Sequence, residues 1–166
     1  MDIREATAAD WPFIYPIFRD IVAAGQTYAY PENLTLEGAR EVWMVDHVVV
    51  ATSGETILGS AKMGPNRPGR GAHIATASFM VDPAARGQGV GRALGNYLVE
   101  WASSCGYRGI QFNAVVETNA TAVHLWQELG FSIIGTVPEA YDHADHGLVG
   151  LHVMYRSLDG ERMIRS

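Results

Sequence analysis

The sequence is poor in cysteine, in lysine and in long apolar runs. Its 166 residues include one cysteine, Cys105, and one lysine, Lys62. A single cysteine excludes an intramolecular disulfide, which fits a reducing cytoplasm. The eleven arginines are scattered and the formal net charge is −6, so there is no basic stripe for a nucleic-acid backbone. No stretch approaches the roughly 18 uninterrupted apolar residues that span a bilayer. We therefore expect a soluble, cytoplasmic protein that binds neither nucleic acid nor membrane.

Length and composition predict one domain. Apolar residues make up 48% of the chain, and a chain of about 150 residues buries roughly 70% of its unfolded surface. We expect a single domain over residues 1–166, with its core in about 2–157.

The spacing of apolar residues predicts a mixed fold. Helices are expected at 10–25, 35–44, 89–105 and 119–129. Strands are expected at 3–7, 47–52, 56–63, 73–81, 110–116, 131–137 and 148–155, with a polar loop at 138–147. Asp10 should cap the first helix, Pro16 should kink or restart it, and Cys105 should lie on the buried face of the third. The fold class is α/β (α+β): a mixed, mostly antiparallel central sheet flanked by helices, and not a doubly wound sheet.

The most informative segment is a glycine-rich turn between a strand and a helix. Three glycines lead into the helix, namely Gly87, Gly89 and Gly91. Glycine permits positive φ and lets a ligand approach the main chain. Successive N–H groups can then face one concavity, assisted by the positive end of the helix dipole. Because Arg86 and Arg92 add positive charge, the turn predicts a pyrophosphate site.

Three phosphate motifs compete for this turn. A Walker A loop needs a Gly-Lys pair, and the only lysine lies elsewhere. A dinucleotide fingerprint needs a third glycine where Arg92 or Leu94 stands. The remaining motif, Arg/Gln-x-x-Gly-x-Gly/Ala, is matched by Arg86, Gly89 and Gly91.

With this motif the sequence resembles the GNAT superfamily of acyl-coenzyme A-dependent N-acetyltransferases. The segment from Asn119 to Phe131 is similar to a second motif of that family, Asn-x-x-Ala-x-x-Leu-Tyr-x-x-x-Gly-Phe. The element order over nearly the whole chain also matches, so the resemblance implies a GNAT-like sheet. The loops near Tyr28 and Tyr141 loosely resemble those of the phosphinothricin acetyltransferase branch.

The resemblance implies acetyl-CoA as cosubstrate and no metal. The pantetheine arm would pair with the main chain of the preceding strand, and the amide of Met80 or Val81 would face the thioester carbonyl. An amide there acts as an oxyanion donor, which makes Val81 a candidate catalytic residue. The implied cofactor-binding residues are Phe79, Met80, Val81, Arg86, Gly87, Gln88, Gly89, Val90, Gly91, Arg92, Asn119 and Trp126.

The sequence departs from the family at two positions. Trp126 replaces a tyrosine whose hydroxyl is held to protonate the leaving thiolate, and an indole N–H is no useful acid. Trp126 would instead line the coenzyme channel or belong to the core. The strand before the glycine turn also lacks the glutamate that serves many relatives as general base. His124 points away from Asn119 and Trp126 around the helix, so we expect it on the surface.

Two loops, 27–32 and 139–146, should flank the acceptor. Aromatic residues with polar tips and a few acids suit a small amine. The candidate substrate residues are Tyr28, Tyr30, Ser78 and Tyr141, of which Tyr141 is also a candidate for an acid–base or orienting role. The acids and histidines at 142–146, with His152 beyond them, match no tight metal signature. Solvated loop residues explain them equally well, and we expect no metal.

The predicted function is transfer of acetyl from acetyl-CoA to a small primary amine by direct attack in a ternary complex. The protein would be a monomer or a homodimer. Alternatives are a non-catalytic acyl-CoA-binding module and a protein or peptide N-acetyltransferase, with a nucleotide-binding oxidoreductase as a more distant one.

Overall fold

The computed structural model describes residues 1–162, and side chains through residue 160. The strands are β1 (Asp2–Glu5), β2 (His47–Ser53), β3 (Thr56–Pro65), β4 (Ile74–Val81), β5 (Gly109–Val116), β6 (Ser132–His143) and β7 (Gly147–Ser157). The α-helices are α1 (Trp11–Ala24), α2 (Leu36–Trp43), α3 (Val90–Ser104), α4 (Ala120–Glu128) and α5 (Asp159–Arg162). Short 3-10 helices are η1 (Ala8–Asp10), η2 (Gly69–Gly71) and η3 (Pro83–Ala85).

The strands form one seven-stranded sheet in the order β1-β2-β3-β4-β5-β7-β6. All neighbouring pairs are antiparallel except β4 and β5. The predicted fold class, mixed and mostly antiparallel with flanking helices, is therefore confirmed.

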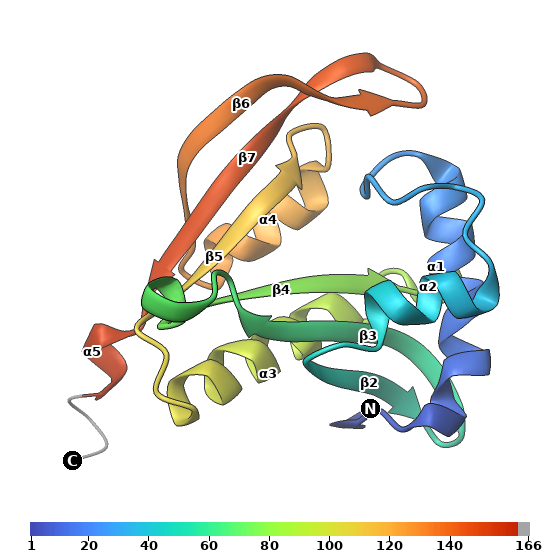
Figure 1. Cartoon of the computed structure of the whole chain (residues 1–166), viewed down its shortest axis with the longest axis horizontal. Coiled ribbons are helices and arrows are strands. Elements are labelled where there is room, and N and C mark those ends of the chain that lie inside the picture. Colours follow the sequence, from blue (N-terminus) through green and yellow to red (C-terminus); the bar gives the residue numbers. More distant parts are fainter. Residues whose placement is uncertain (163–166) are drawn as a thin grey trace.

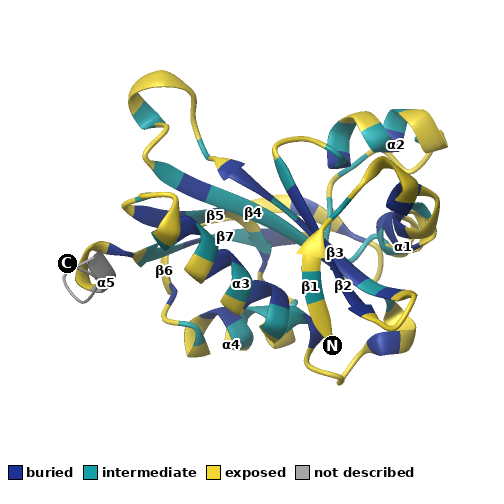
Figure 2. Ribbon diagram, turned by 90° about the horizontal axis from the view of Figure 1, so that it is seen from below, coloured by how far each residue is buried: buried dark blue, intermediate teal, exposed yellow. Residues whose placement is uncertain are grey.

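Alternation along the strands separates two cores, one on each face of the sheet. In β2, Val48 and Val50 pack with α1 and α2, whereas Val49 and Ala51 pack with α3. Figure 2 shows α1 and α2 on one side of the sheet and α3 and α4 on the other. Both faces of the strands are thus covered, which explains the continuous apolar run of β2.

The two halves of the sheet diverge between β4 and β5. Their parallel pairing covers only Ile74 with Gly109 and Ala75 with Ile110. Beyond this point Figure 1 shows β4 running toward α1 while β5 rises with β7. From Ala77 to Val81, β4 therefore pairs with β3 on one side and with no strand on the other. We call this unpaired side the open edge of β4.

The predicted loop at 138–147 was wrong, because β6 continues to His143. The register shifts between Val137 and Tyr141, and Glu139 has a φ of +51°. Pro138 lies within this bulge, where a missing N–H is tolerated. Pairing resumes from Tyr141 opposite Val149, so the segment is a strand despite its proline.

Three local expectations for helices need correction. Residues 11–24 form one helix with Pro16 inside it, so the expected restart is wrong and the expected kink stays a prediction. Asp10 is the N-cap residue of α1 but makes no side-chain cap, because its carboxylate binds Arg4 at 2.8 Å through both oxygens. Cys105 is exposed rather than buried, because α3 ends at Ser104 and the chain turns there.

The Thr35 cap is confirmed, since its Oγ1 accepts from the Gly38 N–H at 3.0 Å. Within residues 1–162, every helix is too short or too polar to cross a membrane.

Candidate functional site

The glycine-rich turn forms an open cradle of main-chain N–H groups. After β4, the Asp82 carboxylate accepts from the Ala84 N–H at 2.9 Å and starts η3. Gly87 and Gly89 follow, each with a φ of +78°, and Gly89 is the N-cap of α3. A Cβ at either glycine would meet no protein atom within 4 Å. In the described part of the chain neither of these N–H groups donates a hydrogen bond. The turn therefore exposes unpaired donors at a helix N-terminus, a geometry that suits an anion.

The two arginines of this cradle differ in their surroundings. Arg86 is exposed and forms no ion pair among the described residues. Arg92 is paired with Glu128 of α4, and its hydrogen bond is the main cause that lowers the Glu128 pKa. His124 lies 3.3 Å from the same carboxylate and its side chain is 75% exposed, so the predicted surface position is confirmed.

Main-chain direction decides which groups of β4 face the open edge. The Asp82 N–H donates to the Leu58 carbonyl of the β3 side at 2.8 Å. Because main-chain groups alternate along a strand, those of Met80 also face β3. Those of Phe79 and Val81 face the open edge. Of the two amides expected to meet a thioester, only that of Val81 is directed there.

A tyrosine from another segment occupies the open edge at Phe79. The Tyr28 hydroxyl donates to the Phe79 carbonyl at 2.6 Å and accepts from the Phe79 N–H at 2.7 Å. Burial raises the Tyr28 pKa well above its usual range, so the hydroxyl stays neutral. The ring stacks on Tyr30 with 5.8 Å between centroids.

A cavity of about 240 Å³ lies beside Tyr28, between the end of α1 and β6. Its lining residues are Val22, Gly25, Tyr28, Ala29, Tyr30, Glu32, Ala140, Tyr141 and Asp142. Tyr141 is buried, and its hydroxyl donates to the Tyr28 carbonyl at 3.3 Å. Burial raises the Tyr141 pKa. The structure thus brings the three predicted tyrosines together in one cavity.

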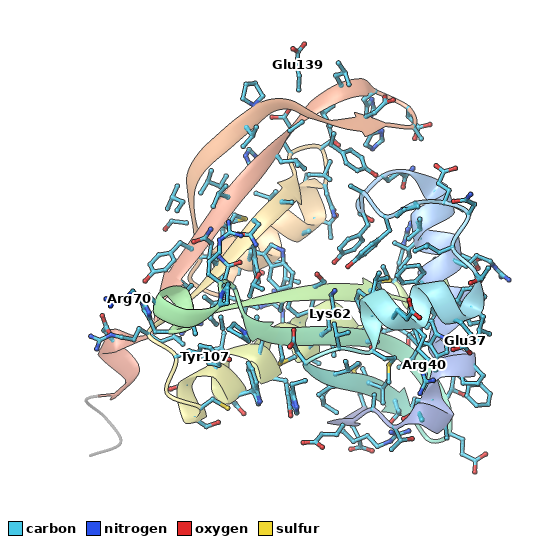
Figure 3. All side chains as sticks on the ribbon, viewed as in Figure 1. Glu37, Arg40, Lys62, Arg70, Tyr107 and Glu139 are labelled. Atoms are coloured by element: carbon cyan, nitrogen blue, oxygen red, sulfur yellow. The ribbon has the colours of Figure 1, made fainter. Side chains whose placement is uncertain are left out.

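Two carboxylates in this lining, Glu32 and Asp142, were not singled out from the sequence as substrate residues. The sequence signal that could have identified them is an acid beside aromatic residues in each flanking loop. Glu139, in the same predicted loop, is different: Figure 3 shows its side chain pointing away from the rest of the molecule. The bond between Tyr28 and Phe79 had no sequence signal, because it joins residues 51 positions apart.

Lys62 supports the aromatic side of the cavity from β3. Its Nζ donates to the Val42 carbonyl at 2.7 Å and lies 5.6 Å from the Tyr30 ring centroid (Figure 3). Ser78 is opposite Lys62 in the β3–β4 register and does not line the cavity, so its expected role as a substrate residue stays a prediction.

Trp126 and Asn119 have structural partners in α4. Trp126 is buried, with its ring 4.7 Å from that of Phe79 and 4.9 Å from that of Phe112. It therefore packs where β4 and β5 diverge. The Asn119 side chain accepts from the Ala122 N–H at 3.3 Å and caps the helix.

A second depression, of about 320 Å³, lies along α3 and is lined by Tyr97, Glu100, Trp101 and Ser104. All four residues belong to α3 and lie beyond the first turns of that helix, away from the glycine-rich turn at its N-terminus. The first cavity adjoins a residue bonded to the open edge of β4, so we assign the candidate site to the first.

Known proteins with a similar sequence and fold belong to one family. The model of the Acetyltransferase (GNAT) family matches residues 4–131. The structure is similar to that of a GCN5-related N-acetyltransferase from Kribbella flavida, with 60% identity and a TM-score of 0.92 over 95% of this chain and 97% of that one. The L-methionine sulfoximine/L-methionine sulfone acetyltransferase of Pseudomonas aeruginosa is 31% identical over 146 residues, which are 82% of this chain and 83% of that protein.

Some of the similar structures were solved with acetyl-CoA. An example is yncA from Salmonella typhimurium with acetyl-CoA, which is 26% identical, with a TM-score of 0.82 over 96% of this chain and 94% of that one. The chain spans only 41% and 13% of the lengths of two similar yeast proteins, which are therefore much longer than the parts that match this chain.

Proposed function

Because this chain belongs to the GNAT family of acetyltransferases, we propose that it transfers an acetyl group from acetyl-CoA to a small primary amine. The cavity beside Tyr28 would bind the acceptor, and the whole chain would act as one domain. A cytoplasmic location of the protein stays a prediction from its cysteine content. The protein is predicted to be a monomer or a homodimer.

The observation that carries the proposal is the junction of the cavity with the open edge of β4. Tyr28 lines the cavity with its ring and binds Phe79 with its hydroxyl. A donor held along this edge and an acceptor held in the cavity would therefore be neighbours. Such proximity is the main contribution an enzyme of this type needs to make.

The residues of the cradle fit acetyl-CoA. Open, unpaired N–H groups at Gly87 and Gly89 and the exposed guanidinium of Arg86 suit its diphosphate. The main chain of Phe79 and Val81 would hold the pantetheine arm. When bound, acetyl-CoA supplies an activated acyl group as a thioester.

The cavity suits an amine that arrives protonated. The carboxylates of Glu32 and Asp142 line it and would attract an ammonium group. Tyr141 is fixed by its bond to the Tyr28 carbonyl and would orient the acceptor. A volume of about 240 Å³ limits the acceptor to a small molecule, such as an amino acid derivative. The name of the Pseudomonas aeruginosa relative supports the same class of acceptor.

The test is release of CoA thiol from acetyl-CoA across a panel of methionine sulfone, other amino acids, polyamines, aminoglycosides and peptides. We expect turnover with one small amine class and an acetylated product of the matching mass. Binding of acetyl-CoA without turnover on any acceptor would favour a non-catalytic module. Acetylation of peptides alone would favour a protein acetyltransferase.

A further inference from the structure

The Tyr28 hydroxyl takes the place of a neighbouring strand at one residue of β4. A strand neighbour satisfies both main-chain groups of a residue that faces it. Tyr28 does so for Phe79 with a single oxygen, 2.7 Å from the nitrogen and 2.6 Å from the carbonyl oxygen. A hydroxyl can do this because it both accepts from an N–H and donates to a C=O through one atom.

The two candidate amides of the open edge differ in their distance from the cavity. Phe79 is bonded directly to Tyr28, which lines the cavity. Val81 lies two residues further toward the glycine-rich turn, a displacement of about 7 Å along an extended strand. The acyl carbon must meet an amine in the cavity, so its oxygen has to lie at the cavity end of the edge. Phe79 fits this requirement better than Val81.

The GNAT family membership implies that a main-chain amide of this strand receives the acyl oxygen. We propose that in this chain the amide is the N–H of Phe79, and that the Tyr28 hydroxyl occupies it until acetyl-CoA arrives. This inference rests on the proposed function. Tyr28 is then a positioning residue, because it acts through the Phe79 main chain. Its oxygen accepts from this N–H at 2.7 Å, as a carbonyl oxygen would.

The exchange follows from the need of main-chain groups for partners. If Tyr28 leaves, the Phe79 carbonyl needs a donor and its N–H needs an acceptor. Acetyl-CoA has amide N–H groups for the first and a thioester carbonyl for the second, whereas CoA lacks the thioester carbonyl. Complete replacement of Tyr28 is therefore expected with acetyl-CoA and not with CoA.

The exchange also couples the two substrates. The Tyr28 main chain is held by Tyr141 at 3.3 Å, so only the side chain needs to turn. A released hydroxyl would enter the cavity beside Tyr141 and become available to the acceptor. The acceptor site would thus be completed after the donor has bound, which predicts ordered binding with acetyl-CoA first.

The test compares acetyl-CoA and CoA binding by calorimetry in the wild type, Tyr28→Phe and Tyr15→Phe. Tyr15 is the matched control, because its hydroxyl donates to the Leu34 carbonyl at 3.3 Å in the same aromatic cluster and it does not line the cavity. Removing the resident hydroxyl should tighten acetyl-CoA binding about 3- to 10-fold, as expected for net loss of a competing hydrogen bond. The affinity for CoA should change less than about twofold, and Tyr15→Phe should change neither.

An unchanged ratio of acetyl-CoA to CoA affinity in Tyr28→Phe would overturn this inference while leaving the proposed function standing. If the wild type bound neither compound, the proposed function would fail and this inference with it.

A second measurement needs no variant. Amide chemical shifts of the ¹⁵N-labelled wild type are recorded with acetyl-CoA and with CoA. We expect the two complexes to differ most at the Phe79 N–H, because only one of them offers it a carbonyl. A larger difference at Val81 would assign the oxyanion donor to Val81 and overturn the proposal.

Discussion

Arg92 in the first turn of α3 is bound to Glu128 near the end of α4. The pair connects the two helices on one face of the sheet, next to the glycine-rich turn. This guanidinium is therefore already neutralised by a carboxylate. An incoming diphosphate would have to share Arg92 with Glu128 or displace it.

Replacing Glu128 by Gln should strengthen CoA binding. Both side chains of the pair are about half exposed, so the expected gain is modest, about two- to fivefold. The gain should shrink as salt is raised, because exposed charges are screened. Calorimetric titration with CoA at low and at high salt measures both effects.

Glu37→Gln is the matched control for Glu128→Gln. Glu37 pairs with Arg40 at 3.9 Å on α2, on the other face of the sheet (Figure 3). The substitution Glu37→Gln removes the same formal charge from the protein as Glu128→Gln does. An equal gain in both variants would show a general effect of net charge and would exclude a specific role for Arg92.

Asp10→Asn should destabilise the fold. The Asp10 carboxylate is nearly buried, binds Arg4 through both oxygens, and accepts from the Thr7 N–H at 2.7 Å. The hydrogen bond from Arg4 lowers the pKa of Asp10 from 3.8 to about 2. Because Arg4 is half exposed, we expect a loss of about 1–2 kcal/mol in the free energy of unfolding. Urea denaturation at pH 7 measures it.

The same carboxylate predicts a pH dependence. A depressed pKa in the folded state contributes stability above the unfolded value of 3.8, and this contribution disappears as pH falls toward 2. The difference in stability between wild type and Asp10→Asn should therefore shrink from about pH 5 downward. Asp20→Asn, which breaks an exposed pair with Arg19, should show neither effect. A difference independent of pH would refute the ionic explanation.

Neutralising the cavity carboxylates should weaken the acceptor alone. Glu32→Gln and Asp142→Asn remove charges that line the cavity. We expect a rise in acceptor KM of about 3- to 10-fold for each, with acetyl-CoA affinity unchanged. Steady-state kinetics with the best amine of the panel provides the KM.

Glu139→Gln is the control, because Glu139 lies in the bulge of β6 next to this lining but points away from the molecule (Figure 3). Its KM should equal that of the wild type. If all three variants raised KM alike, the cavity would not be the acceptor site.

Most helices and strands of this protein could be predicted from the sequence, because the spacing of apolar residues is a local property. The apolar run of β2 and the stripe of α3 both follow from which face each residue packs against. Pro138 misled the prediction of β6, because a local breaker signal cannot reveal a bulge that long-range pairing tolerates. The predicted side-chain cap at Asp10 was wrong for a similar reason, since Arg4 competes with the start of α1 for the same carboxylate.

The glycine-rich turn was predictable for a further reason. The positive φ of Gly87 and Gly89 is a requirement that few other residues meet, so the residue types carry the conformation. The acceptor cavity was predictable only as two loops with suitable residues. That Tyr28 binds Phe79, and that Asp142 lines the cavity while Glu139 points away from the molecule, depends on tertiary contacts without a local signature.

The central claim is that the turn at 87–91 holds the diphosphate of acetyl-CoA. Gly89→Glu tests it most directly, with Gly54→Glu as the control. Both glycines have positive φ, +78° and +58°, and at both a Cβ would meet no protein atom within 4 Å, so the cost of backbone strain is matched. Gly54 lies in the turn between β2 and β3.

Calorimetric titration of both variants with CoA is the decisive measurement. A carboxylate at position 89 would place negative charge among the donors of the cradle. The account predicts a loss of CoA affinity of at least about 100-fold in Gly89→Glu and wild-type affinity in Gly54→Glu, with similar losses of thermal stability in the two. Undiminished CoA affinity in a folded Gly89→Glu variant would contradict it.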